Sequence, residues 1–183
     1  MTSEAAVPIK ADGMELLRGV AHQSENTTGL LFHGSPQVIN LLKPRPVYWK
    51  DPTGKLYDDS EGPVICASDK PFIATFMSLV PRDADWGYVS KGDPDSLKYY
   101  IGAAYKEQFI HAVGYVMVLQ SAGFEKVVPP IPVGWEYDLP IGGRMPEMRS
   151  GEEKVRPLYA IKVGYDDFED LLRIQGDSRI EYR

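Results

Sequence analysis

The stretch GLLFHGSP, at residues 29–36, is an apolar run that ends at a histidine and is closed by a glycine and a proline. This pattern predicts a short buried strand that stops abruptly. A histidine at the end of such a strand is held by a rigid element, and the glycine that follows lets a ligand approach the backbone. His33, Gly34 and Ser35 are therefore candidate binding residues, and the alternative is a core histidine followed by a tight turn.

The next informative stretch, residues 64–76, predicts a strand, a turn and a helix. The strand covers residues 64–67, and Ser68 or Asp69 is expected to cap a helix at residues 71–79. Pro71 is tolerated in the first turn of that helix because its missing N–H would have no partner there. Phe76 on the helix offers an aromatic face for a flat heterocycle. The alternative is that Phe76 belongs to the buried face of the helix.

Working outward, the pattern predicts a helix at residues 13–21 capped by Asp12 and a strand at 114–119. It also predicts a short strand around Met148, a strand at 158–163 and a helical turn at 166–173. Residues 50–62 and 82–95 read as loops, residues 96–109 have no clean period, and residues 127–134 read as a connector. Few short helices and scattered strands predict a single α+β domain over residues 1–183 with a mixed or antiparallel sheet. Residues 1–11 are expected to be loose at the surface.

Composition excludes several classes of protein. The chain has 183 residues and a formal net charge of −6, which argues against broad electrostatic binding of nucleic acid. Cys66 is the single cysteine, so an intramolecular disulfide or a cysteine-based zinc site is not expected. His22, His33 and His111 show no paired spacing, so we expect no metal. No apolar run suits a membrane span, and residues 1–10 lack the pattern of a signal peptide, so we expect a cytoplasmic protein.

A third candidate is Glu147, in the stretch PEMRS at residues 146–150, just ahead of a predicted strand. A lone glutamate near a loop is usually solvated, and Glu136, Glu152 and Glu153 compete with it for any catalytic role.

Taken together, the three stretches resemble the ADP-ribosyltransferase superfamily. LLFHGS is similar to the Leu-Leu-Trp-His-Gly-Ser stretch of poly(ADP-ribose) polymerase catalytic domains. Residues 64–77 resemble the strand, turn and helix that follow, where an alanine ends the strand and a tyrosine lies on the helix; here Ala67 and Phe76 occupy these positions. Residues 147–163 resemble the late part of the family, where a catalytic glutamate opens a strand. The order His, aromatic, Glu is that of the diphtheria-toxin-like branch.

The resemblance implies a split sheet and a cleft that binds NAD. His33 would hydrogen-bond a ribose hydroxyl, and the Gly34 backbone, helped by Ser35, would hold the nicotinamide carboxamide. Ala67 would border this site, and Phe76 would stack on the nicotinamide ring.

Tyr88 or Tyr99 would form the opposite wall of the cleft. Glu147 would stabilise the positive charge that develops on the ribose as the nicotinamide leaves, and no metal is required. Because NAD is anionic, Lys43, Arg45 and Lys70 are expected to supply local positive charge.

The resemblance leaves three functions open. The first is an ADP-ribosyltransferase or NAD glycohydrolase whose acceptor is a protein, a nucleic acid or water. The second is a catalytically inactive binding module of the same fold, because Phe76 lacks the tyrosine hydroxyl of the family. The third is an NAD-dependent RNA 2′-phosphotransferase, although the Arg-His pair of those enzymes does not occur in this sequence.

Overall fold

The computed structural model describes residues 5–23, 25–50, 56–58, 62–90, 97–127, 147–174 and 180–182. In these segments the chain forms one α+β domain with four α-helices and several small, mainly antiparallel sheets. The predicted class, mixed α+β in a single domain, is therefore confirmed.

The central sheet has the strand order β1-β7-β10, with β1 at Leu30–Ser35, β7 at Val113–Gln120 and β10 at Tyr159–Gly164. All its pairs are antiparallel, and β7 lies in the middle. The side chains of four consecutive β7 residues, Val116 to Leu119, are fully buried because both faces of the sheet are covered. The strands predicted at 29–35, 114–119 and 158–163 are thus confirmed.

A second sheet has the order β4-β9-β8, with β4 at Ile65–Ala67, β9 at Glu147–Ser150 and β8 at Glu125–Val127. In the described residues it joins the central sheet through one bridge, in which Phe32 and Ser68 exchange two backbone hydrogen bonds of 2.8 Å. Beyond this bridge β1 and β4 separate, and a small hydrophobic cluster lies between the two sheets, formed by Val7, Leu31, Leu42, Ile65, Ala67, Met117, Leu119 and Ala160.

Besides the short helix at Lys106–Ile110, which adds Phe109, three longer helices contribute to the larger hydrophobic core. They are α1 at Gly13–Ala21, α2 at Pro71–Leu79 and α4 at Tyr165–Ile174. The helices predicted at 13–21, 71–79 and 166–173 are confirmed. In α1, Leu17 and Ala21 are buried on one face, as their spacing indicates. An ion pair of 2.6 Å between Arg18 Nε and Asp170 Oδ2 links α1 to α4.

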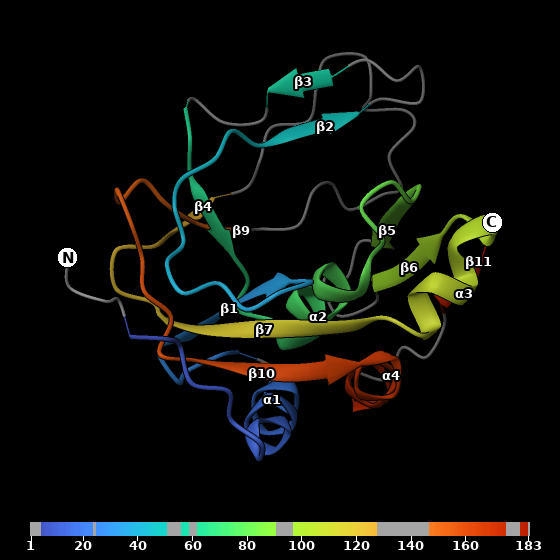
Figure 1. Cartoon of the computed structure of the whole chain (residues 1–183), viewed down its shortest axis with the longest axis horizontal. Coiled ribbons are helices and arrows are strands. Elements are labelled where there is room, and N and C mark those ends of the chain that lie inside the picture. The colour runs from blue at the N-terminus through green and yellow to red at the C-terminus, as the bar shows by residue number, and fades with distance from the viewer. Residues whose placement is uncertain are drawn as a thin grey trace.

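A third sheet has the order β11-β6-β5, with β5 at Trp86–Ser90, β6 at Leu97–Ile101 and β11 at Ile180–Tyr182. A 3-10 turn η1 at Ala103–Tyr105 and helix α3 at Lys106–Ile110 follow β6. A hairpin of β2 at Tyr48–Lys50 and β3 at Leu56–Asp58 lies at the top of Figure 1. The loops predicted at 50–62 and 82–95 are therefore wrong at residues 56–58 and 86–90. Each short strand gains its hydrogen bonds from a partner in another segment, which local composition does not reveal.

Two local expectations also need correction. Residues 5–11 are attached rather than loose: Lys10 N donates to Ala160 O at 2.8 Å, and Val7 is buried. The expected caps make no capping hydrogen bonds. Asp12 precedes α1 without a side-chain bond to it, and Lys70 is the residue that precedes α2. The Ser68 hydroxyl instead accepts a hydrogen bond from Lys70 N at 3.0 Å, which orders the turn before the helix.

Candidate functional site

The His33 ring lies where β1 separates from β4. Its Nδ1 atom is 2.7 Å from Cys66 O. A carbonyl oxygen only accepts hydrogen bonds, so Nδ1 carries the proton and, in the neutral ring, Nε2 is an acceptor. Burial, which disfavours the charged ring, lowers the pKa of His33 below its ordinary value. The nearby positive charge of Arg45 lowers the pKa further, and the bond to Cys66 opposes the shift in part. His33 therefore presents a hydrogen-bond acceptor at neutral pH.

Gly34 directs its backbone groups into the gap between the two strands. Residues of an antiparallel strand send their N–H and C=O groups alternately to either side. Phe32 sends both groups to Ser68 on β4, so Gly34, two residues later, points to the same side. Over the residues that the structure describes, the pairing between β1 and β4 does not continue to this position. The Gly34 amide and carbonyl thus offer one donor and one acceptor to a ligand in the gap.

The packing of α2 on β1 also requires a glycine at position 34. A Cβ atom there would collide with Ala74 O and would lie 2.8 Å from Ser78 N, both in the backbone of α2. Glycine at this position therefore allows α2 to pack directly on β1, whatever ligand binds.

Ser35 and Ala67 border the gap but are largely buried. Ser35 Oγ accepts a hydrogen bond of 3.2 Å from Gln37 N, which closes the turn after β1. Ala67 pairs with Met148 and belongs to the small cluster between the sheets. The two residues border the gap. Of their two side chains, only that of Ser35 carries a polar hydrogen, on its hydroxyl group.

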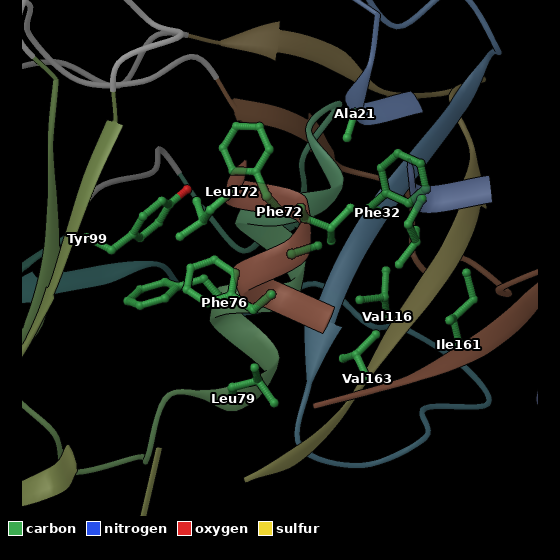
Figure 2. Packing of buried hydrophobic residues seen from close by; sticks show 14 of the residues in the cluster. Ala21, Phe32, Phe72, Phe76, Leu79, Tyr99, Val116, Ile161, Val163 and Leu172 are labelled. Carbon is green, nitrogen blue, oxygen red and sulfur yellow. The ribbon is translucent and has the colours of Figure 1, made fainter. Parts of the chain in front are cut away.

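Phe76 lies among the packed side chains of the core (Figure 2). None of its surface is exposed. Its ring centroid is 4.5 Å from that of Tyr99, which is only 1% exposed. Trp86, Phe109 and Phe168 surround the Phe76 ring with centroids at 5.5–5.7 Å. Phe76 and Tyr99 therefore pack against each other and present no face to a ligand. This corrects the stacking roles expected for them and agrees with the alternative of a buried helix face.

Glu147 is the first residue of β9, and its side chain is 25% exposed. Its Oε2 atom is 3.2 Å from Nη2 and 3.3 Å from Nε of Arg149. Arg149 was not singled out from the sequence, although a Glu-x-Arg spacing on a strand places both side chains on one face. The competing Glu136 lies outside the described residues, and Tyr88 is described only as part of the β5 backbone.

Strand pairing brings the backbones of His33 and Glu147 to the same part of the fold. Ala67 pairs with Met148, so Ser68 and Glu147 are the next residues at that end of the ladder, and Ser68 is bridged to Phe32. The backbones that carry His33 and Glu147 therefore flank β4, about 10 Å apart at two strand spacings. Alternation sends the His33 side chain toward the small cluster and Glu147 away from it. The two side chains therefore leave the sheet on opposite faces at this end of the β4–β9 ladder.

Positive charge is present near this gap. The positive charge of Arg45 lowers the pKa of His33. The backbone of Arg45 makes two hydrogen bonds of 3.0 Å with that of Val64. Lys70 precedes α2 directly after the Ser68 turn. Lys43 instead lines a separate surface hollow with Leu41, Pro44, Glu153 and Lys154. Arg45 is thus the cation most directly tied to the candidate site.

Comparisons with models of known families, with curated proteins and with solved structures give no match for this chain. In the described segments, no three His, Cys, Asp or Glu side chains come together as a metal-binding group. None of the helices in those segments has the length and hydrophobicity that a bilayer span requires.

Proposed function

We propose that this chain binds NAD and cleaves its nicotinamide–ribose bond, as an ADP-ribosyltransferase or NAD glycohydrolase. The observation that carries the proposal is the gap between β1 and β4. There the Gly34 peptide groups and the neutral His33 ring meet, and Glu147 opens the strand on the other side of β4. This combination of a backbone donor and acceptor, a ring acceptor and a carboxylate matches what the reaction needs.

Each group has a definite task in this proposal. The Gly34 N–H donates to the oxygen of the nicotinamide carboxamide, and the Gly34 carbonyl accepts from its amide. His33 Nε2 accepts a hydrogen bond from a ribose hydroxyl. As the glycosidic bond breaks, positive charge grows on the ribose, and the Glu147 carboxylate stabilises this state more than the ground state. Glu147 also accepts a hydrogen bond from the acceptor nucleophile and removes its proton. Arg45 offsets part of the phosphate charge of NAD.

Calorimetry with NAD and with nicotinamide tests the binding step. Saturable binding of NAD that is competed by nicotinamide supports the proposal, and no heat with either compound would refute it. Nicotinamide release from NAD then tests the chemistry. Glu147→Gln should lower turnover about 100-fold or more and leave NAD affinity nearly unchanged.

Glu153→Gln is the matched control, because this exposed glutamate lies six residues further along the chain. It should turn over like the wild type. Full activity of Glu147→Gln together with loss in Glu136→Gln would assign the catalytic carboxylate to Glu136.

A second candidate function is a binding module without turnover. Its supporting observation is the complete burial of Phe76 and Tyr99, which leaves both expected stacking residues in the core. It predicts saturable binding of NAD or ADP-ribose and no nicotinamide release during long incubation.

A further inference from the structure

Arg149 is a buried cation on the same strand as Glu147. It is the third residue of β9, and its side chain is only 8% exposed. Its guanidinium group places a positive charge inside the sheet. Such a charge is costly to bury unless acceptors surround it. The Glu147 carboxylate is one of these acceptors.

Arg149 contacts only one of the two carboxylate oxygens of Glu147. Arg149 Nη2 and Nε both lie 3.2–3.3 Å from the same carboxylate atom, Glu147 Oε2. In the part of the chain that the structure describes, no hydrogen bond reaches Glu147 Oε1. The contact therefore occupies one oxygen of the carboxylate and leaves the other for a further partner.

The surroundings of Arg149 restrict its movement. It stands between two paired strands, opposite Cys66 on β4 and opposite Glu125 on β8. Residues two apart on a strand share a face, so the short Glu147 side chain lies directly beside the longer Arg149. Two donors on one planar group fix the carboxylate more firmly than the single flexible ammonium of a lysine would.

We propose that Arg149 is a positioning residue for Glu147: by binding Oε2 it orients the carboxylate so that Oε1 faces the reacting ribose. The inference rests on the proposed function. It assigns to Arg149 a role in turnover rather than in NAD binding, because Arg149 acts through Glu147. Misplacing a catalytic carboxylate by about 1 Å lowers the rate about 100-fold.

The test measures nicotinamide release and NAD affinity for the full chain and its variants. Arg149→Ala should lower kcat about 100-fold, with KM and the calorimetric Kd for NAD changed less than about threefold. Guanidinium ion added at millimolar concentration should restore part of kcat in Arg149→Ala. It can enter the space left by the arginine side chain and bind Glu147 Oε2. It should not restore Glu147→Gln. Arg173→Ala, which changes an arginine that is 72% exposed, is the control and should match the wild type.

Thermal melting shows which variants fold. If Arg149→Ala does not fold, Arg149→Lys decides: it keeps the charge but loses the two-donor geometry, and it should show a reduced kcat with an unchanged Kd. Normal kcat in a folded Arg149→Ala or Arg149→Lys, or equal loss of kcat and of affinity, would overturn the positioning role alone. A wild-type chain that binds NAD but releases no nicotinamide would overturn the proposed turnover, and the positioning role with it.

Discussion

At the scale of single residues, His33 shows how one contact sets the chemistry of a side chain. The bond from Nδ1 to Cys66 O determines which ring nitrogen accepts hydrogen bonds, and burial keeps the ring neutral. The same imidazole on an exposed loop would exchange tautomers and would titrate near its ordinary value. The fold therefore converts an ordinary histidine into a fixed acceptor.

The lowered pKa of His33 predicts a pH dependence of stability. The unfolded chain binds a proton at His33 near the ordinary value of about 6.5, whereas the folded chain binds it only at lower pH. Stability is therefore retained above about pH 6.5 and is lost as the pH falls from there toward the folded-state pKa. Urea unfolding at several pH values should show this loss in the wild type. NMR titration of the ring should give a midpoint below 6.5.

His33→Asn is the matched variant, because the asparagine amide replaces the Nδ1 donor to Cys66 but offers no acceptor at the position of Nε2. It should fold, lose this part of the pH dependence and bind NAD about tenfold more weakly, as expected when about one hydrogen bond is lost. Unchanged NAD affinity in His33→Asn would remove His33 from the binding site.

At the scale of elements, α2 determines the shape of the candidate site. Gly34 on β1 and Gly114 on β7 lie under this helix, where a Cβ atom would meet Ala74 and Ser78 respectively. The helix also uses small residues at these contacts, so its backbone reaches the sheet. This close packing holds the end of β1, and with it the peptide groups that point into the gap.

Gly34→Ala should therefore destabilise the fold strongly, although it adds only one methyl group. The new methyl group collides with the backbone of α2 rather than with a side chain that can rotate, so the helix must shift. We expect a loss of about 3 kcal/mol in the free energy of unfolding, measured with urea.

Gly19→Ala is the control for this substitution. A Cβ atom at this position would meet nothing within 4 Å, and Gly19 lies on the exposed side of α1. It should stabilise the chain by about 0.5–1 kcal/mol, since alanine loses less backbone entropy than glycine in a helix. A wild-type stability for Gly34→Ala would mean that α2 does not pack this closely.

At the scale of the whole molecule, the aromatic core explains why the expected ligand wall is missing. Phe76 from α2, Tyr99 from β6, Phe109 from α3 and Phe168 from α4 meet in one cluster, so four separate elements depend on it. Edge-to-face and tilted ring contacts of this kind contribute beyond the area they bury. Phe76 is therefore held by packing of the entire domain.

This position yields a prediction that opposes the resemblance. Phe76→Tyr restores the residue type expected on the helix, but its hydroxyl would enter an apolar cluster. It should lower the free energy of unfolding by about 1–3 kcal/mol and should not raise NAD turnover. Phe124→Tyr, at a half-buried turn position, should change stability by less than about 0.5 kcal/mol. Increased turnover without loss of stability in Phe76→Tyr would place residue 76 at the ligand.

Sequence patterns alone determined the elements whose signals are local. The strands around Phe32, Val116 and Ile161 are continuous apolar runs, and α2 begins at a proline that suits a first turn. The histidine and glycine at the end of β1 were also recognisable, because a strand that stops at His-Gly-Ser is a local pattern.

Tertiary structure decided what depends on pairing between distant segments. The short strands β3, β5, β8 and β11 exist because partners elsewhere in the chain satisfy their backbone groups. The burial of Phe76 and the contact between Arg149 and Glu147 follow from packing and register. A sequence shows which side chains share a face of one strand, but only the assembled sheets show which of them meet water, a neighbour or a ligand, because burial belongs to the whole fold.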